Sequence, residues 1–293
     1  MRVRSESRKR SPRGARVALC SLALVIGCGS TAAREAAHEA SPDVTSAPVA
    51  AEPMPDGVEL RQLRHQGDDY RVVSVDLRRV DLDLYGLTSG EGDVKTIPAL
   101  RSWLQTHGRR LSMATNSGIF GTAGRPVGLH IERGREQQSL NLDSGLGNFF
   151  LKPNAVFYLH GLGATPTARV VQSESFHANP RELRLATQSG PALVLHGSVN
   201  AAFTSDSTSL KVRSGVGVAA SDPHVVHFAI SEGPVRFYDF ATLFRDALEC
   251  SDALYLDGSI SVLCAPDCGA SEHANDSFGG LLAVTVPASP STP

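Results

Sequence analysis

Four segments of the sequence place glycines beside polar side chains where apolar stretches end. They are Thr115–Phe120, Gln188–Val194, Arg213–Val218 and Leu254–Ser261. Glycine tolerates positive φ and lets the backbone come close to a ligand, so these segments could line a polar cleft. The alternative is that they are only turns, since Asp257-Gly258 is a common hairpin dipeptide.

Arg213 is the basic residue of this set. Its planar guanidinium could hold a phosphate through two parallel hydrogen bonds. The N–H groups of Gly215 and Gly217 could complete an anion-binding cradle beside it. The alternative is an arginine engaged in a surface salt bridge.

Several common catalytic motifs are missing from the sequence. It contains no Gly-x-Ser-x-Gly elbow, no His-Glu-x-x-His and no Walker-type phosphate loop. The run Gly215–Ala220 superficially resembles a dinucleotide-binding fingerprint. That motif must follow a strand and open a helix, whereas Ser221-Asp222-Pro223 leads here into another predicted strand, so the fingerprint is rejected.

The elements that must position these residues are mostly strands, because apolar and polar residues alternate with period two. The longest alternation runs through Tyr70–Leu77 and Val80–Tyr85 and predicts one long strand or a hairpin. The other predicted strands are Arg110–Thr115, Gly128–Arg133, Ala155–His160, Ala192–His196, Val225–Ser231, Ala253–Leu256 and Leu281–Val286.

Two helices are predicted. Thr96 can cap a helix that starts near Pro98 and ends at Gly108, and Asp239 can cap a second one that carries Phe240 and Leu243 on its apolar face. Many strands, few helices and 27 glycines predict an α+β fold with a mainly antiparallel sheet core. Residues 58–287 are expected to form a single domain.

The N-terminus predicts export. Seven basic residues and one acidic residue precede or begin a short apolar run that ends at Gly27-Cys28, as in a secretory signal. Val25–Cys28 resembles a bacterial lipobox, which makes residues 1–27 a signal peptide and Cys28 the lipidated N-terminus. An ordinary cleaved signal that contains a cysteine is the alternative. No aspartate follows Cys28, which favours an outer-membrane anchor that faces the periplasm or the cell surface.

The segments that flank the domain have a linker composition. After Cys28, the stretch to residue 57 is rich in Ala, Pro, Ser and Glu and predicts a flexible tether, and residues 288–293 are similar. Without the signal, 21 basic and 29 acidic residues remain, a net charge near −8. This charge argues against non-specific nucleic-acid binding.

Cysteine usage agrees with export. Cys250, Cys264 and Cys268 remain in the domain, and two of them are expected to pair in an oxidising compartment, with the partners left open. A zinc site of these cysteines and His273 matches no strong ligand spacing. Carboxylate and carbonyl oxygens could hold Ca²⁺, but no dedicated calcium loop is present, so no metal or cofactor is assigned.

The four glycine-containing segments, in this order and spacing, resemble the phosphodiester glycosidase family. Its best-known member, the uncovering enzyme, removes N-acetylglucosamine from a sugar phosphodiester, and this chain is more similar to an uncharacterised bacterial branch. The resemblance covers roughly residues 58–286. Further matching stretches are Arg125–Glu132, Gly147–Phe150, Pro153–Phe157, Ala229–Val235 and Phe244–Ala247.

Two turns depart from the family pattern. The Asn-Gly-Gly-Phe-Phe turn is Asn116–Phe120 here, and the glycine-rich run after the aspartate is reduced to Gly258–Ser261. These changes predict a different sugar, and they leave open a loss of catalysis.

The resemblance implies cleavage of a glycosidic C–O bond, which usually uses carboxylates. Asp257, at the end of an apolar strand, is the first candidate for nucleophile or general base. Glu132 shares a strand face with His130 and is the second, although an exposed strand-face pair is its alternative. Glu232, at another strand end, is the weakest. The expected substrate-binding residues are Asn116, Gly118, Arg213, Gly215, Gly217, Gly258 and Ser259.

The sequence therefore predicts a lipid-anchored envelope hydrolase that acts on sugar-1-phosphodiesters of glycopolymers or glycolipids. Its expected partners are that carbohydrate substrate and, through Cys28, a membrane. A second hypothesis is a non-catalytic lipoprotein that binds glycans or anions. A third is a structural or assembly lipoprotein whose domain is only a scaffold.

Overall fold

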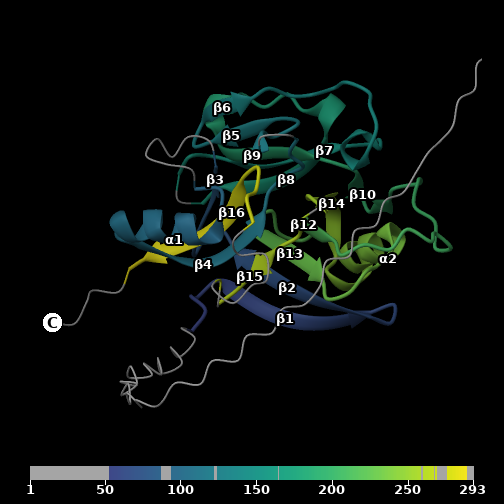
Figure 1. Cartoon of the computed structure of the whole chain (residues 1–293), viewed down its shortest axis with the longest axis horizontal. Helices are drawn as coiled ribbons and strands as arrows, with labels where there is room; N and C mark the ends of the chain where they lie inside the picture. Colours follow the sequence, from purple (N-terminus) through teal and green to yellow (C-terminus); the bar gives the residue numbers. More distant parts are fainter. Residues whose placement is uncertain are drawn as a thin grey trace, which may run out of the picture. The chain divides into compact units, whose positions relative to one another are not determined.

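Sixteen strands and two short helices make up the described part of the chain (Figure 1). The computed structural model describes residues 53–86, 94–121, 124–163, 165–258, 260–266, 268 and 276–288. These residues all belong to one unit that spans residues 50–293. The predicted signal peptide, Cys28, the greater part of the linker and residues 289–293 lie outside the described residues. None of the described helices is long and apolar enough to span a membrane.

The largest sheet has seven strands, and every pairing in it is antiparallel. In spatial order these are β1 (Val58–His65), β2 (Asp68–Asp76), β13 (Val225–Ser231), β12 (Ser214–Ala219), β14 (Cys250–Tyr255), β10 (Ala192–Leu195) and β11 (Ser198–Val199). Because β12 is followed by its antiparallel neighbour β13 and not by a helix, the dinucleotide fingerprint is correctly rejected.

Two smaller antiparallel sheets complete the fold. The four-stranded sheet has the order β15 (Leu263–Cys264), β4 (Arg109–Asn116), β16 (Leu281–Pro287) and β3 (Asp81–Tyr85). The five-stranded sheet has the order β6 (Arg135–Gln138), β5 (His130–Glu132), β9 (Leu183–Ser189), β7 (Ala155–His160) and β8 (Thr167–Gln172). The predicted α+β fold with mainly antiparallel sheets is confirmed.

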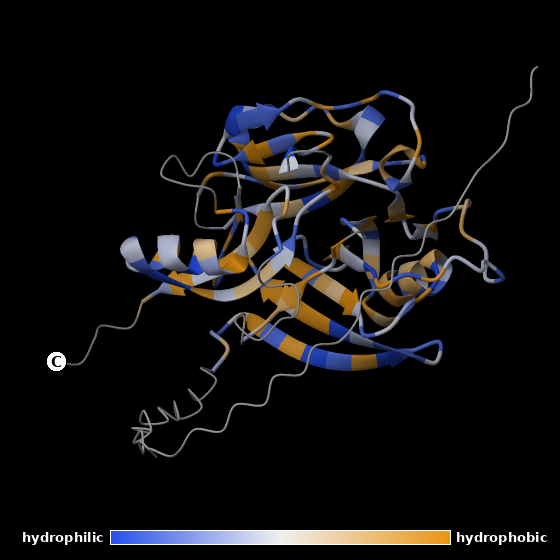
Figure 2. Ribbon diagram, viewed as in Figure 1, coloured by the Kyte–Doolittle hydropathy of each residue, from blue (hydrophilic) through white to orange (hydrophobic). Residues whose placement is uncertain are grey.

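One apolar cluster joins all three sheets. It includes Val73 and Phe228 of the seven-stranded sheet, Phe157 of the five-stranded sheet and Leu84 and Val284 of the four-stranded sheet. The other face of each sheet has its own cover, so the molecule is layered. In Figure 2 the apolar residues are concentrated in the strands that make these contacts, and the edge strand β1 alternates between apolar and polar along its length.

Helix α1 (Ile97–Thr106) covers the four-stranded sheet through Ile97, Leu100 and Leu104. Its start and end are those predicted: the Thr96 hydroxyl accepts a hydrogen bond from the Ala99 N–H at 3.2 Å, and Gly108 follows with φ of +65°.

Helix α2 (Phe237–Thr242) and the π-helical turn η5 (Leu243–Ala247) cover the outer face of the seven-stranded sheet. The sequence prediction for the start of this helix was wrong. Arg236 is the N-cap, and Asp239 lies inside the first turn, where the carboxylate is paired with Arg236 at 3.2 Å. A further three short 3-10 turns are η2 (Asn148–Phe150), η3 (Ser173–Ser175) and η4 (Pro180–Glu182).

The alternation from Tyr70 to Tyr85 is neither one strand nor a hairpin. β2 belongs to the seven-stranded sheet, whereas β3 pairs only with β16 in the four-stranded sheet. A turn after Asp76 changes the direction of the chain. The period-two alternation continues on both sides of this turn, so the sequence pattern does not indicate it.

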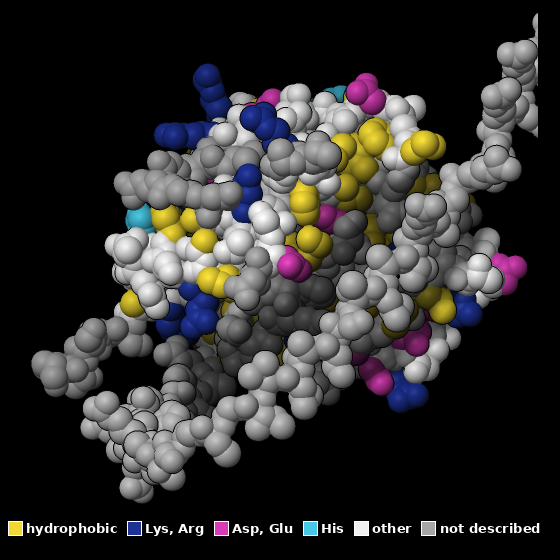
Figure 3. All heavy atoms as spheres, viewed as in Figure 1, with side chains coloured by type: hydrophobic (Ala, Val, Ile, Leu, Met, Phe, Trp, Pro, Cys, Tyr) yellow, Lys and Arg dark blue, Asp and Glu magenta, His cyan; other side chains and the backbone are white. Residues whose placement is uncertain are grey.

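Ion pairs connect the four-stranded and five-stranded sheets. Arg184 of β9 donates to Asp83 at 2.8 Å and to Asp81 at 2.9 Å, both on β3, and Arg109 of β4 donates to Asp81 at 2.8 Å. Figure 3 shows further basic side chains gathered over β5 and β6, where Arg133 is exposed. This cross-sheet network fixes β3 against β9 and so positions the strand end that follows Tyr85.

Candidate functional site

Asn116, the last residue of β4, joins two sheets through its side chain. Its Oδ1 accepts hydrogen bonds from the Ser214 hydroxyl and the Val262 N–H, both at 3.0 Å. Its Nδ2 donates to the carbonyl oxygens of Asp257 at 3.1 Å and Ser117 at 3.4 Å. These four bonds use both donors and both acceptor positions of the amide. The polar atoms of Asn116 are thus engaged by the protein, which gives the side chain a structural role; its predicted contact with a sugar stays a prediction.

Asp257 follows the end of β14 and is held through its backbone. Its carbonyl oxygen lies 3.1 Å from the Ser214 hydroxyl and 3.0 Å from the Ser261 hydroxyl, in addition to Asn116. Its N–H donates to the Ser117 carbonyl at 3.3 Å. These bonds hold the backbone of Asp257 at the end of β14 and so place its side chain at this strand end. We call Asn116, Ser117, Ser214, Asp257 and Ser261 the strand-end cluster.

The strand-end cluster also reaches the five-stranded sheet through Gly118. The Gly118 N–H donates to the Thr187 hydroxyl at 3.1 Å. A Cβ atom on Gly118 would lie 2.3 Å from the Gln188 carbonyl oxygen, so only glycine fits this approach. Gly118 therefore permits close contact with β9, and its predicted role in substrate binding stays a prediction. All three sheets meet at this point.

Glu132 is the second carboxylate brought to this region. It is 3% exposed, and its Oε1 lies 2.7 Å from Nε2 of His130, which is fully buried. The chain at Gly280 connects this pair to the cluster: its carbonyl accepts the Ser117 N–H at 2.9 Å, and a Cβ atom there would meet the His130 ring and the Ser117 hydroxyl. The exposed strand-face alternative for Glu132 is excluded.

Arg213 precedes β12 and is 1% exposed. Its Nε donates to the Val235 carbonyl at 2.9 Å, and its guanidinium carbon lies 3.5 Å from the centre of the Phe237 ring. Within the described part of the chain Arg213 forms no ion pair with a carboxylate, so the surface salt-bridge alternative is excluded. Burial lowers the pKa of Arg213, and hydrogen bonding to Tyr255 opposes this shift.

Tyr255 lies between Arg213 and Asp257. Burial raises the pKa of Tyr255 to about 12, the Arg213 charge acts in the opposite direction, and the Asp257 charge raises it further. Its hydroxyl occupies the space that a Cβ atom on Gly258 would need. Gly258 is thus required for packing against Tyr255, and Ser259, which follows it, lies outside the described residues.

The anion cradle predicted from Gly215 and Gly217 is not formed. Both glycines lie inside β12, where their backbones pair with β13 and β14. A Cβ atom on Gly217 would lie 2.6 Å from the Phe244 ring, and one on Gly215 would lie 3.0 Å from the Phe240 ring. These glycines let the helical cover pack onto the sheet, and a strand interior leaves no N–H groups to converge on an anion.

Glu232 is not brought to the strand-end cluster. Its side chain is 40% exposed and forms an ion pair with Arg71 of β2 at 3.0 Å. Its described contacts are with β2, including the bond from its N–H to the Asp69 carbonyl at 2.9 Å. This geometry is that of a surface ion pair, and we do not assign it a catalytic role.

The sequence did not identify the serines and threonine that organise the site. Ser214, Ser261 and Thr187 lie 98, 145 and 71 positions from Asn116 in the chain, so local pattern carries no sign of their contacts. The sequence did indicate a contact for His130, because it lies two residues before Glu132 on the same strand face. The structure confirms that the two side chains are in contact.

The cysteine pairing that the sequence left open is resolved in the structure. Cys264 and Cys268 form a disulfide, and Cys250 is free and buried. Burial raises the pKa of the Cys250 thiol. The disulfide uses two of the four residues of the zinc site considered above.

Comparisons with known proteins agree with the resemblance. The family model described as phosphodiester glycosidase matches residues 109–275, a region that contains Asn116, Glu132, Arg213 and Asp257. The uncharacterized protein YigE of Escherichia coli (strain K12) is 37% identical over 166 residues, which are 57% of this chain and 62% of that protein. The chain therefore spans less than two thirds of this relative.

Among solved structures, the fold is similar to the zebrafish N-acetylglucosamine-1-phosphodiester alpha-N-acetylglucosaminidase catalytic domain, auto-inhibited by its pro-peptide. The TM-score is 0.52 with 14% sequence identity, over 80% of this chain and 84% of that one. At this level of identity the likeness concerns the fold.

Proposed function

Because the chain belongs to the phosphodiester glycosidase family, we propose that it hydrolyses the glycosidic bond of a sugar-1-phosphodiester. Water would replace the phosphate at the sugar carbon and give a free sugar and a phosphomonoester. The observation that carries the proposal is the position of Asp257, which four backbone hydrogen bonds hold where the three sheets meet.

Asp257 is the proposed nucleophile or general base. Cleavage of a glycosidic bond passes through an oxocarbenium-like state that a nearby carboxylate stabilises. A phosphate is already a good leaving group, so protonation of the leaving oxygen contributes less than in the cleavage of an ordinary glycoside. Glu132 is the proposed second carboxylate, since Ser117 and Gly280 connect its strand to Asp257.

Arg213 is the proposed contact for the phosphate. A buried guanidinium without a carboxylate partner carries an uncompensated charge, which an anionic ligand would neutralise. Its Nε and one terminal nitrogen donate to the carbonyl oxygens of Val235 and Ser209. To bind the phosphate, the guanidinium would exchange its contact with Tyr255 for one with the substrate.

Attachment to the cell envelope through Cys28 is part of the proposal. The lipobox-like run before Cys28 and the Ala- and Pro-rich stretch after it support a domain that is tethered to a membrane and reaches a surface glycopolymer or glycolipid. Mass spectrometry of the exported protein tests this point: a diacylated Cys28 is expected, and an unmodified N-terminus at another residue contradicts it.

The activity is tested with the full-length protein in detergent. It is incubated with a panel of sugar-1-phosphodiesters, including nucleotide sugars, with and without calcium, and released free sugar is measured. Asp257→Asn is expected to lower kcat about 1000-fold, because it removes the carboxylate but keeps the shape of the side chain. Glu174→Gln, which alters an exposed ion pair with Lys152, is the control and should retain full activity.

The outcome also decides between hydrolase and binding protein. If no substrate is cleaved but glycan phosphodiesters still bind, and Arg213→Met abolishes that binding in a folded protein, the chain is a non-catalytic glycan-binding lipoprotein. If it neither cleaves nor binds them, the domain is a scaffold.

A further inference from the structure

His130 is a buried titratable residue for which the proposed reaction has so far no use. Its side chain is 0% exposed on β5. Nε2 lies 2.7 Å from Oε1 of Glu132, whereas Nδ1 is buried and has no hydrogen-bond partner among the described residues. The backbone packs close to this pair: a Cβ atom on Gly280 would lie 2.8 Å from the His130 ring, and one on Gly86 would lie 3.4 Å from Oε1 of Glu132.

The contacts of the two ring nitrogens determine where the proton resides. A proton on Nδ1 would be a buried donor without an acceptor, which costs about 1–3 kcal/mol. A proton on Nε2 instead donates to the Glu132 carboxylate, a charge-assisted bond that is stronger than a neutral one. A hydrogen on Nε2 therefore has an acceptor, whereas a hydrogen on Nδ1 has none among the described residues. The enclosed ring thus presents a single fixed donor to Glu132.

We propose that His130 is a positioning residue that orients the Glu132 carboxylate for glycosidic bond cleavage. This inference rests on the proposed function and assigns His130 a task that acts through Glu132. A buried histidine that donates to a carboxylate helps to fix the orientation of that carboxylate, and reactive groups need such support from their neighbours. Gly86 and Gly280 let the backbone pack close to the pair, so the ring and the carboxylate lie in a confined space.

The matched test compares His130→Gln with His130→Leu. Glutamine can place its Nε2 donor close to the position of the imidazole Nε2, whereas leucine fills similar space without any donor. We expect His130→Leu to lower kcat about 100-fold with KM unchanged, because a carboxylate displaced by about 1 Å loses that much. His130→Gln is expected to stay within about threefold of the wild type. Equal losses in both variants, or no loss in His130→Leu, would overturn the inference.

Protein stability is measured on the same samples, since a packing defect would lower the thermal midpoint of both variants. A kcat that follows the presence of the donor and not the midpoint supports positioning. A kcat that follows the midpoint contradicts it.

A measurement without substrate separates this inference from the proposed function. The ¹⁵N shifts of the His130 ring are recorded in the wild type and in Glu132→Gln. We expect protonation on Nε2 alone in the wild type and altered shifts in the variant, and protonation on Nδ1 would overturn the inference even in an active enzyme. If the wild type cleaves no substrate while Nε2 is protonated, the proposed function fails, and the catalytic role of His130 with it.

Discussion

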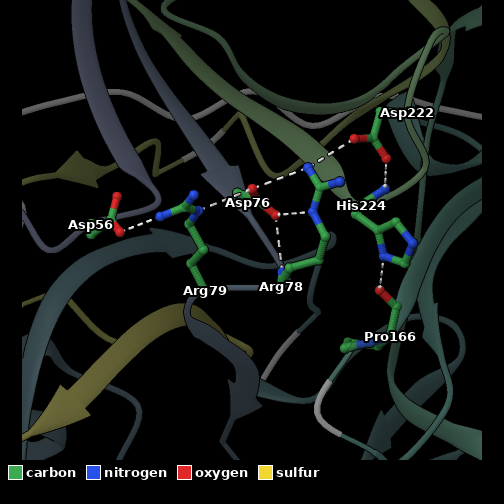
Figure 4. Close-up of polar contacts among 7 residues, drawn as sticks. All are labelled: Asp56, Asp76, Arg78, Arg79, Pro166, Asp222 and His224. Carbon is green, nitrogen blue, oxygen red and sulfur yellow. Dashed lines mark hydrogen bonds and ion pairs between the residues drawn. The ribbon is translucent and has the colours of Figure 1, made fainter.

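At one end of the seven-stranded sheet β12 begins and β14 ends beside Asn116, and at the other end β2 ends among exposed charged side chains. Both ends connect segments far apart in the chain. At the first, the strand-end cluster is 0–6% exposed and is joined by bonds to neutral amide, hydroxyl and backbone groups. At the second, aspartates and arginines pair with one another in contact with water (Figure 4).

We call the end of the sheet at the strand-end cluster the site end, and the end at Asp76, Arg78, Arg79 and Asp222 the charged end. Figure 4 shows how the residues of the charged end are connected. Arg78 donates to Asp76 from Nε at 2.8 Å and pairs with Asp222 at 2.9 Å. Arg79 pairs with Asp56 before β1. The Arg78 and Arg79 side chains are 46% and 55% exposed. Water can replace every one of these partners when a pair separates, so each bond stabilises the fold only slightly.

The comparison indicates where the fold tolerates change. A buried donor or acceptor that loses its partner finds no water, whereas an exposed charge does. The site end should therefore respond strongly to single substitutions, and the charged end weakly. The site end is also where the chain fixes the position of Asp257, so stability and activity should fall together there.

Asn116→Ala is predicted to have the largest effect. It leaves the Val262 N–H without its acceptor and removes a donor from the Asp257 carbonyl, which should lower the free energy of unfolding by roughly 3–5 kcal/mol. Urea titration measures this loss. The matched control is Asn200→Ala, another buried asparagine, whose side chain makes two hydrogen bonds in place of four. Equal losses in the two variants would contradict a special role of the strand-end cluster.

Stability at the two ends of the sheet should depend on pH in different ranges. The first range is set by His227, in the interior of β13. Burial lowers its pKa to about 4, and Arg61 adds to the shift. The unfolded chain, with a pKa near about 6.5, binds the proton first, so stability is full above that pH and falls as pH decreases towards 4. The loss should be about 2 kcal/mol at pH 5 relative to pH 7.5.

The charged end should respond only at lower pH. The hydrogen bond from Arg78 lowers the pKa of Asp76, so its stabilisation is present above the unfolded value and is lost as pH falls through the folded one. His227→Gln should therefore flatten urea midpoints between pH 7.5 and 5 without altering the decline at more acidic pH. An unchanged slope between pH 7.5 and 5 would show that another group is responsible.

Loss of the disulfide should destabilise the site end less than Asn116→Ala does. Cys264 and Cys268 anchor the end of β15, whose first residue pairs with Thr115 next to Asn116. A loop this short contributes roughly 2 kcal/mol when it is closed. Cys264→Ser with Cys268→Ser should lower the unfolding free energy by that amount, as should reduction of the wild type. Reductant should have no further effect on the double variant, and a further loss would implicate another bond.

Local features of the fold were predictable because their causes are local. The Thr96 cap, the start of α1 and the bounds of β13 follow from residues within one turn or one strand. The separation of β2 from β3 was not predictable, because the alternation continues on both sides of the turn and the partner strands lie far away in the chain.

The residues of the candidate site also fall into two groups, those that local sequence indicates and those whose role depends on distant contacts. Asp257 and Glu132 could be selected because carboxylates at strand ends and on strand faces are visible in the sequence. The task of Gly217 was not visible, since the same residue type serves a tight turn or a helix that packs closely, and only the position of Phe244 distinguishes them. The engagement of both ends of the Asn116 amide likewise depends on Ser214 and Val262, which no local pattern connects to it.

Asp222→Asn should have the smallest effect of the series. The substitution removes the charge that pairs with Arg78 but retains an oxygen that can accept the His224 N–H, a bond of 2.9 Å in the wild type. The turn before β13 should therefore persist, and only an exposed ion pair is lost, which shifts the thermal midpoint by no more than about 3 °C. The shift should shrink further in 1 M salt, because salt screens the pair in the wild type as well. A large shift that persists in salt would mean that the exposed network acts as one cooperative unit. The two ends of the sheet would then differ in the chemistry of their contacts but not in how strongly those contacts stabilise the fold.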